Sequence, residues 1–164
     1  MTTSNFLFEN LNAELISVHA DVSSRKRLLE EMARLLAIPL IQKALEDELD
    51  DVKEKDIYHQ LWEREKLGNT GIGNGVALPH SRSQQAHKAI IAIITLEQPI
   101  DYDSLDRQPV DVAFGLLVPM EATQDHLNLL ADIARMMSND ANKSAIAKAT
   151  SAEKIIQLIE KWSK

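Results

Sequence analysis

The sequence predicts a single α/β domain in which helices cover both faces of a β-sheet. Its 164 residues fit one domain, and a hydrophobic content of 45% is enough for a sizeable core. Two near-continuous aliphatic runs, residues 89–96 and 110–118, are typical of strands that are buried on both faces. Segments with helical hydrophobic spacing precede and follow these runs and would supply the covering helices.

The N-terminal part predicts a lead-in, a strand and a long helix. Residues 1–13 are polar and mixed, so we expect the domain itself to span 14–164. Residues 14–19 alternate loosely and predict the first strand. A helix follows, capped by one of two consecutive serines and extending to about residue 38. We expect Pro39 to end or kink it, because proline removes a backbone donor from a helix interior.

An acidic stretch over residues 41–55 then predicts a solvated helical connection. It lacks the glycine turn and the alternating oxygen ligands of a calcium loop, so we do not expect a metal there. Asp56 is expected to cap a further helix, and Gly68 to end it.

The C-terminal part predicts three helices. The first begins at Thr123 and extends to about Asn139, and the others cover residues 142–149 and 152–162. The residues of the first helix that we expect to face inward are Leu127, Leu130, Ile133, Ala134 and Met137.

Composition excludes several classes of function. The net charge of −7 weighs against a nucleic-acid binder, which concentrates lysine and arginine for phosphate contacts. The absence of cysteine excludes disulfides, zinc-thiolate sites and thiol catalysis. No apolar run is long enough to insert into a membrane, and the N-terminus lacks the pattern of a signal peptide. A cytoplasmic location is therefore expected.

Glycine is concentrated in one loop. Four of the five glycines lie between Gly68 and Gly75, and the loop ends with Pro79 and His80. It is not a P-loop, because asparagine and glycine stand where lysine and serine or threonine are required. It does not fit a dinucleotide fingerprint either, since it follows a helix and leads into a strand. The composition therefore predicts a shaped loop that serves another purpose.

His80 is the candidate nucleophile at the end of this loop. Neutral imidazole has a nitrogen lone pair near pH 7 and forms covalent intermediates. Backbone amides of a glycine-rich turn can stabilise a phosphoryl group without a metal, and Thr70, Asn74 and the preceding Arg64 add polar side chains. These residues alone fit a second interpretation equally well: the glycines form a tight turn, and His80 begins or ends a strand.

His126 is the second candidate. It falls in line with Leu130, Ile133 and Met137 at helical spacing, but in the first turn of its helix. It is therefore expected either beside His80, as a supporting neighbour, or as a satisfied core histidine.

Three blocks of the chain resemble a known family. Residues 64–80 are similar to the phosphorylation-site signature of the fructose/mannitol-type enzyme IIA of the bacterial phosphotransferase system. Residues 106–119 are similar to its second block, and residues 123–127 to the block with its second active-site histidine. The resemblance covers about 15–158, and it is strongest to the stand-alone, nitrogen-regulatory members.

The resemblance implies a phosphocarrier that needs no cofactor or metal and that turns over only with partner proteins. His80 would accept a phosphoryl group from a histidine-phosphorylated, HPr-like donor, and regulatory targets such as a kinase or an ion transporter would read its state. The implied fold is a three-layer sandwich with a mixed sheet. The residues implied to support the phosphate are Arg64, Thr70, Gly71, Gly73, Asn74 and His126.

Two alternatives stay open. One is a sugar-specific enzyme IIA that passes phosphate to a IIB domain, and the other is a non-catalytic binding module. The chain also departs from the family pattern in two places. The connection over residues 38–55 is longer and more acidic than expected, and Ser81 and Arg82 follow the histidine where glycine is common.

Overall fold

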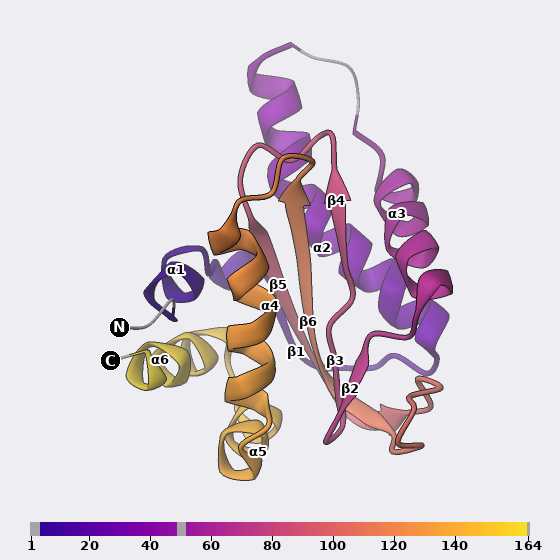
Figure 1. Cartoon of the computed structure of the whole chain (residues 1–164), viewed down its shortest axis with the longest axis vertical. Helices are drawn as coiled ribbons and strands as arrows, with labels where there is room; N and C mark the ends of the chain where they lie inside the picture. The colour runs from indigo at the N-terminus through magenta and orange to yellow at the C-terminus, as the bar shows by residue number, and fades with distance from the viewer. Residues whose placement is uncertain (1–3, 49–51, 164) are drawn as a thin grey trace.

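The computed structural model describes residues 4–48 and 52–163. A mixed sheet lies between two layers of helices (Figure 1), so the predicted three-layer α/β sandwich is confirmed. The division between a lead-in and a domain at residue 14 stays a prediction.

The described strands form one six-stranded sheet in the order β1-β5-β6-β3-β2, and β4 also pairs with β6. The central pair, β5 and β6, is antiparallel, whereas β1 pairs with β5 and both β3 and β4 pair with β6 in parallel. The strands are β1 (Ile16–Ala20), β2 (Gly71–Gly73), β3 (Val76–Ala77), β4 (His80–Ser83), β5 (Ile90–Ile100) and β6 (Val110–Pro119).

β3 and β4 are two halves of one extended edge. Val76 pairs with Val112 and His80 with Leu116, so the register along β6 is unchanged between them. The interruption falls at Pro79, which has no N–H to donate to a ladder. Because β2 pairs only with the β3 half, the β4 half lies at the rim of the sheet, where α3 (Glu54–Leu67) packs beside it.

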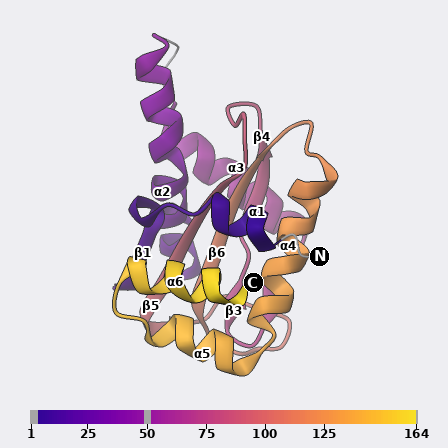
Figure 2. The same cartoon turned by 90° about the vertical axis from the view of Figure 1, so that its left-hand side faces the viewer.

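The two helical layers bury separate cores. On one face, α2 (Arg25–Glu46) and α3 pack against residues such as Ala92 and Ile94. On the other face (Figure 2), side chains of the remaining α-helices pack against the alternate residues Ile91 and Ile93. Those helices are α1 (Ser4–Glu9), α4 (Gln124–Met137), α5 (Asp140–Lys148) and α6 (Ala152–Trp162), and η1 (Ala13–Leu15) precedes β1.

The helices differ from those predicted in several places. Of the two expectations for Pro39, an end or a kink, the end near residue 38 is wrong. α2 continues to Glu46, because Leu40 and Ala44 extend its buried stripe beyond the proline. α3 begins before Asp56, which lies in the first turn, where a carboxylate favours the positive end of the helix dipole. The lead-in contains α1. Residues 49–51 of the predicted acidic connection lie outside the described part of the chain.

The inward face of α4 is rotated from the predicted one. Leu127, expected inside, is 47% exposed, whereas Leu129, Ile133 and Met137 are buried at a spacing of four residues. Leu130 is half-buried between the two faces. The rotation turns Leu127 and Leu130 toward the rim at β4.

Within residues 4–48 and 52–163, no helix is both long enough and apolar enough to cross a membrane.

Candidate active site

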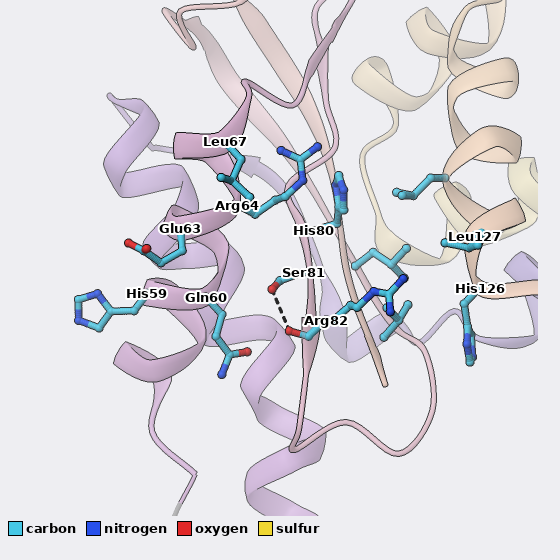
Figure 3. A pocket seen from close by; sticks show the side chains of 13 residues that line it. His59, Gln60, Glu63, Arg64, Leu67, His80, Ser81, Arg82, His126 and Leu127 are labelled. Atoms are coloured by element: carbon cyan, nitrogen blue, oxygen red, sulfur yellow. Dashed lines mark hydrogen bonds between the residues drawn. The ribbon is translucent and has the colours of Figure 1, made fainter. Parts of the chain in front are cut away.

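A cavity of about 700 Å³ opens at the rim of the sheet, between α3 and α4 and above β4 and β6 (Figure 3). It combines apolar walls with a few polar groups, the usual character of a binding site. Its lining residues are His59, Gln60, Glu63, Arg64, Leu67, His80, Ser81, Arg82, Leu116, Val118, His126, Leu127 and Leu130.

His80 begins β4, and the local hydrogen bonds fix its ring. Val76 and Leu78 point to the α4 face of the sheet, and the alternation of a strand places His80 on the same face. The imidazole Nδ1 lies 2.7 Å from the carbonyl oxygen of Leu78. A carbonyl only accepts, so Nδ1 bears the proton and Nε2 carries the lone pair. The nitrogen that is free to act as a nucleophile is therefore Nε2.

The surroundings keep this imidazole neutral. Burial lowers the pKa of His80 below its ordinary 6.5, and the Arg64 guanidinium lowers it further. The contact with Leu78 and the charge of Glu65 act in the opposite direction but do not outweigh burial. Near pH 7 the ring therefore carries a lone pair rather than a positive charge.

Arg64 enters the cavity from the last turns of α3. Its Nη1 donates to the carbonyl oxygen of Gly68, 2.8 Å away, at the end of the same helix. Figure 3 shows its side chain reaching toward the His80 ring. A guanidinium in this position can bind phosphoryl oxygens through its other N–H groups.

His126 enters from the opposite wall, in the first turn of α4. Its Nδ1 accepts a hydrogen bond from the backbone N–H of Thr123, 3.0 Å away, as part of a capping box. Because Nδ1 accepts, the proton of neutral His126 lies on Nε2. The structure thus brings His80, Arg64 and His126 to one cavity, and Figure 3 shows the two histidines on separate elements.

The other predicted phosphate-binding residues do not line this cavity. Thr70 is buried, and its hydroxyl contacts the Glu65 carboxylate and the Tyr102 hydroxyl. The N–H of Gly71 donates to the Asn69 side chain. The expected cradle of loop amides is therefore not formed at His80 among the residues that the structure describes.

Gly73 and Asn74 belong to a hairpin turn between β2 and β3. Asn74 and Gly75 both have positive φ, 58° and 75°, which is the combination that a type I′ turn requires. The Asn74 side chain donates to the carbonyl oxygen of Met137 and ties the turn to α4. Asn-Gly between two short strands is the sequence signal for this hairpin, and it accounts for Asn74, which the family resemblance assigns to phosphate binding.

Sequence reasoning assigned no site role to three features of the cavity. Leu67, 86% exposed, and Leu127 form apolar rims on α3 and α4. Arg82 follows His80 by two residues and donates from Nη1 to the carbonyl oxygen of Met120, at 2.9 Å. Side chains alternate along β4, so Arg82 could have been predicted on the same face as His80. Nothing in the sequence places Leu67 opposite Leu127. In the described part of the chain, no three acidic or histidine side chains gather as a metal site.

Comparison with known proteins identifies the family. The sequence model of the phosphoenolpyruvate-dependent sugar phosphotransferase system EIIA 2 family matches residues 9–162. The chain belongs to this family. Within the EIIA 2 family it is similar to the nitrogen regulatory protein of Pseudomonas aeruginosa, with 39% identity over 87% of this chain and 86% of that protein. The nitrogen regulatory protein of Escherichia coli is 33% identical over 91% of this chain and 86% of its own length.

Solved structures agree with this assignment. The nitrogen regulatory protein IIA-Ntr from Neisseria meningitidis superposes with a TM-score of 0.82 and 33% identity, over 94% of this chain and 99% of that one. The mannitol IIA of Escherichia coli shares the fold, with a TM-score of 0.72 at 14% identity over 91% and 98% of the two chains. The resemblance found in the sequence, to this family and to its nitrogen-regulatory members, is confirmed.

Proposed function

We propose that this EIIA 2 protein is a regulatory phosphocarrier that accepts a phosphoryl group on Nε2 of His80 from a histidine-phosphorylated, HPr-like donor. The observation that carries the proposal is the ring contact to Leu78, which leaves a lone pair on Nε2 inside the cavity. Membership of the family and similarity to nitrogen regulatory proteins support the phosphocarrier and regulatory parts.

The chemistry needs no proton transfer on the acceptor. The lone pair of His80 Nε2 attacks the phosphorus, a new N–P bond forms, and the N–P bond to the donor imidazole breaks, returning its electron pair to the donor. Phosphoryl transfer depends mainly on alignment and on stabilisation of the equatorial oxygens. Arg64 supplies a guanidinium for this purpose, and His126, whose proton lies on Nε2, supplies an N–H from the opposite wall.

The shape of the cavity suits a protein donor. Leu67 and Leu127 are exposed apolar side chains on either side of His80, and they would pack against apolar residues of the donor. Arg64 and Arg82 add positive charge beside them, which complements a phosphorylated side chain. A docked donor would also exclude water from the transferring group.

Regulation follows from the charge that phosphorylation adds. A phosphoryl group brings about −1.5 to −2 charge to an apolar-walled cavity, so a partner that binds the neutral surface would be displaced, and a basic partner recruited. The proposal places the protein in the cytoplasm, with a kinase or an ion transporter as the class of target. Similarity to nitrogen regulatory proteins favours this role over sugar uptake.

The test is transfer from a phosphorylated HPr-like protein. Wild-type protein is expected to acquire one acid-labile, base-stable phosphate, and the His80→Ala variant none. His59→Ala is the matched control, because His59 lines the same cavity from α3, and it should be labelled normally. Labelling of His80→Ala would overturn the assignment. Absence of labelling in the wild type, with partner binding that ignores His80, would instead indicate a binding module.

A further inference from the structure

A buried carboxylate lies next to the cavity, and the phosphoryl chemistry does not use it directly. Glu65 follows Arg64 on α3, and its side chain is 0% exposed. It accepts hydrogen bonds from Arg25 at 2.8 Å, from the Thr70 N–H at 3.1 Å and from the Tyr102 hydroxyl at 3.0 Å, and it also contacts the Thr70 hydroxyl. A buried charge is tolerated only with such a set of partners.

The partners of Glu65 come from separate parts of the fold. Arg25 belongs to the first turn of α2, and Tyr102 to the loop after β5. The Arg25 guanidinium also lies over the rings of Trp62 and Tyr102, at 5.2 Å and 5.1 Å from their centroids. This arrangement joins two helices and a loop at one point, so the carboxylate is a fixed anchor rather than a mobile side chain.

A chain of hydrogen bonds leads from this anchor to His80. The Glu65 carboxylate holds Thr70 through both its N–H and its hydroxyl. The carbonyl oxygen of Thr70 then accepts from the N–H of Leu78, at 2.9 Å. The carbonyl oxygen of Leu78 accepts in turn from Nδ1 of His80, at 2.7 Å. Three successive contacts thus connect a buried anion on α3 to the ring of the phosphoryl acceptor.

We propose that Glu65 and Thr70 are positioning residues, which hold the Leu78 carbonyl against Nδ1 of His80 and thereby keep the lone pair on Nε2. No proton moves along the chain, because each peptide group keeps its own N–H. The effect is on geometry: the Leu78 carbonyl selects the tautomer only while the backbone at residue 70 keeps it in place. A ring freed from this contact would divide its proton between Nδ1 and Nε2 and would present a lone pair to the donor only part of the time.

This role accounts for two facts that the proposed function leaves unexplained. Thr70 falls within the signature segment, yet it lies in the core rather than in the cavity. Glu65 is buried at an energetic cost, although a well-packed apolar residue would avoid that cost. Both facts fit a series of hydrogen bonds that runs from the core and fixes the orientation of the His80 ring. The expected effect on phosphoryl transfer rests on the proposed function, whereas the hydrogen-bonded geometry does not.

The other ionisable groups around His80 do not belong to this series of hydrogen bonds. The cavity receives His59, Glu63 and Arg64 from α3, Arg82 from β4, and His126 from α4. Glu63 is the useful control among them. It is a carboxylate on the same helix as Glu65, but it is 67% exposed and pairs with Lys66 at 2.6 Å.

The experiment is ¹⁵N NMR of the His80 ring in the free protein above pH 8, where the imidazole is neutral. Wild-type protein should show the proton on Nδ1. In Glu65→Gln and Thr70→Val, part of the population should move its proton to Nε2. Thr70→Ser, which keeps the hydroxyl, and the control Glu63→Gln should retain the wild-type signature. Rates of phosphoryl acceptance should fall about two- to fivefold in Glu65→Gln and Thr70→Val, in proportion to the share of rings that lose the Nε2 lone pair.

An unchanged Nδ1–H signature in folded Thr70→Val and Glu65→Gln would overturn the proposal, as would an equal change in Glu63→Gln. If Glu65→Gln does not fold, the comparison of Thr70→Val with Thr70→Ser decides. The NMR measurement needs no phosphoryl donor. If the wild-type protein shows the expected tautomer but is never phosphorylated, the proposed function is contradicted and the positioning role of Glu65 and Thr70 stands.

Discussion

His80 and His126 line the same cavity, but they are held by opposite kinds of contact. Nδ1 of His80 donates to a carbonyl, whereas Nδ1 of His126 accepts from a backbone N–H. The first ring consequently has its lone pair on Nε2, and the second has its proton there. The comparison shows that the backbone next to a histidine, rather than the residue type, determines which half of the reaction it can serve.

The two elements that carry these histidines explain the difference. An edge strand that is interrupted by Pro79 leaves the Leu78 carbonyl within reach of the ring that follows it. A helix N-terminus instead presents unpaired N–H groups, and a side chain in the first turn accepts from one of them. The strand thus leaves a lone pair on Nε2 of His80, and the helix start leaves an N–H on Nε2 of His126.

Substitutions at His126 give the largest expected effect after loss of His80 itself. The asparagine in His126→Asn keeps an acceptor near the position of Nδ1 but has no donor near Nε2, whereas glutamine has a donor near Nε2. We expect transfer to fall about 100-fold in His126→Asn and clearly less in His126→Gln, because one donor to a developing charge is worth that much. Single-turnover transfer rates check this. Equal rates in the two variants would contradict the donor role.

Arg64→Gln should have the next largest effect. Loss of a charged donor to the phosphoryl oxygens is expected to slow transfer about tenfold or more. Removing the positive charge should also raise the pKa of His80, since Arg64 lowers it in the wild type. Transfer assays and an NMR titration of His80 measure the two effects. Lys66→Gln is the control, as Lys66 is a cation of α3 that does not line the cavity.

The pH dependence of transfer should report His80. Burial lowers the pKa of this imidazole below 6.5, so the rate is expected to be constant above that value and to fall as acid protonates Nε2. Stability follows the same direction. In the unfolded state His80 takes up its proton near pH 6.5, before the folded state does. The free energy of unfolding therefore decreases as the pH drops below 6.5, and this decrease stops once the pH is below the lowered pKa of the folded state. A rate midpoint above 6.5 would contradict this account.

The smallest expected effect is on stability. His126→Ala removes the acceptor that caps α4, which should cost about 1 kcal/mol of unfolding free energy. His126→Gln retains an acceptor at the position where a capping box favours glutamine, so it should cost less. Denaturant unfolding of both variants measures the difference. Equal losses of stability in the two variants would contradict the capping role of the His126 side chain.

The fold was largely predictable because its signals are local. Residues 89–96 and 110–118 are buried on both faces, so they read as continuous aliphatic runs and became β5 and β6. The helix end predicted near Pro39 is wrong, because the burial of Leu40 beyond it depends on tertiary packing, which the sequence does not display. The face of α4 was misjudged for the same reason.

The site was predictable only in part. The preceding loop points to His80, and helical spacing with the family resemblance points to His126. The structure places both at one cavity, and their roles stay predictions. The role of Thr70 could not be read from the chain, because its hydroxyl meets Tyr102, 32 residues away. The family resemblance assigns Gly73 and Asn74 to phosphate binding, although Asn74 and Gly75 form a hairpin turn. Contacts between distant segments decide such roles.

The central claim is that Nε2 of His80 accepts the phosphoryl group while His126 assists. The most direct measurement is ¹⁵N and ³¹P NMR of protein that a phosphorylated HPr-like donor has labelled. The account predicts a single phosphohistidine, with coupling between phosphorus and Nε2 of His80 and an unmodified His126 ring. Phosphorus bonded to Nδ1 of His80, or to either nitrogen of His126, would contradict it.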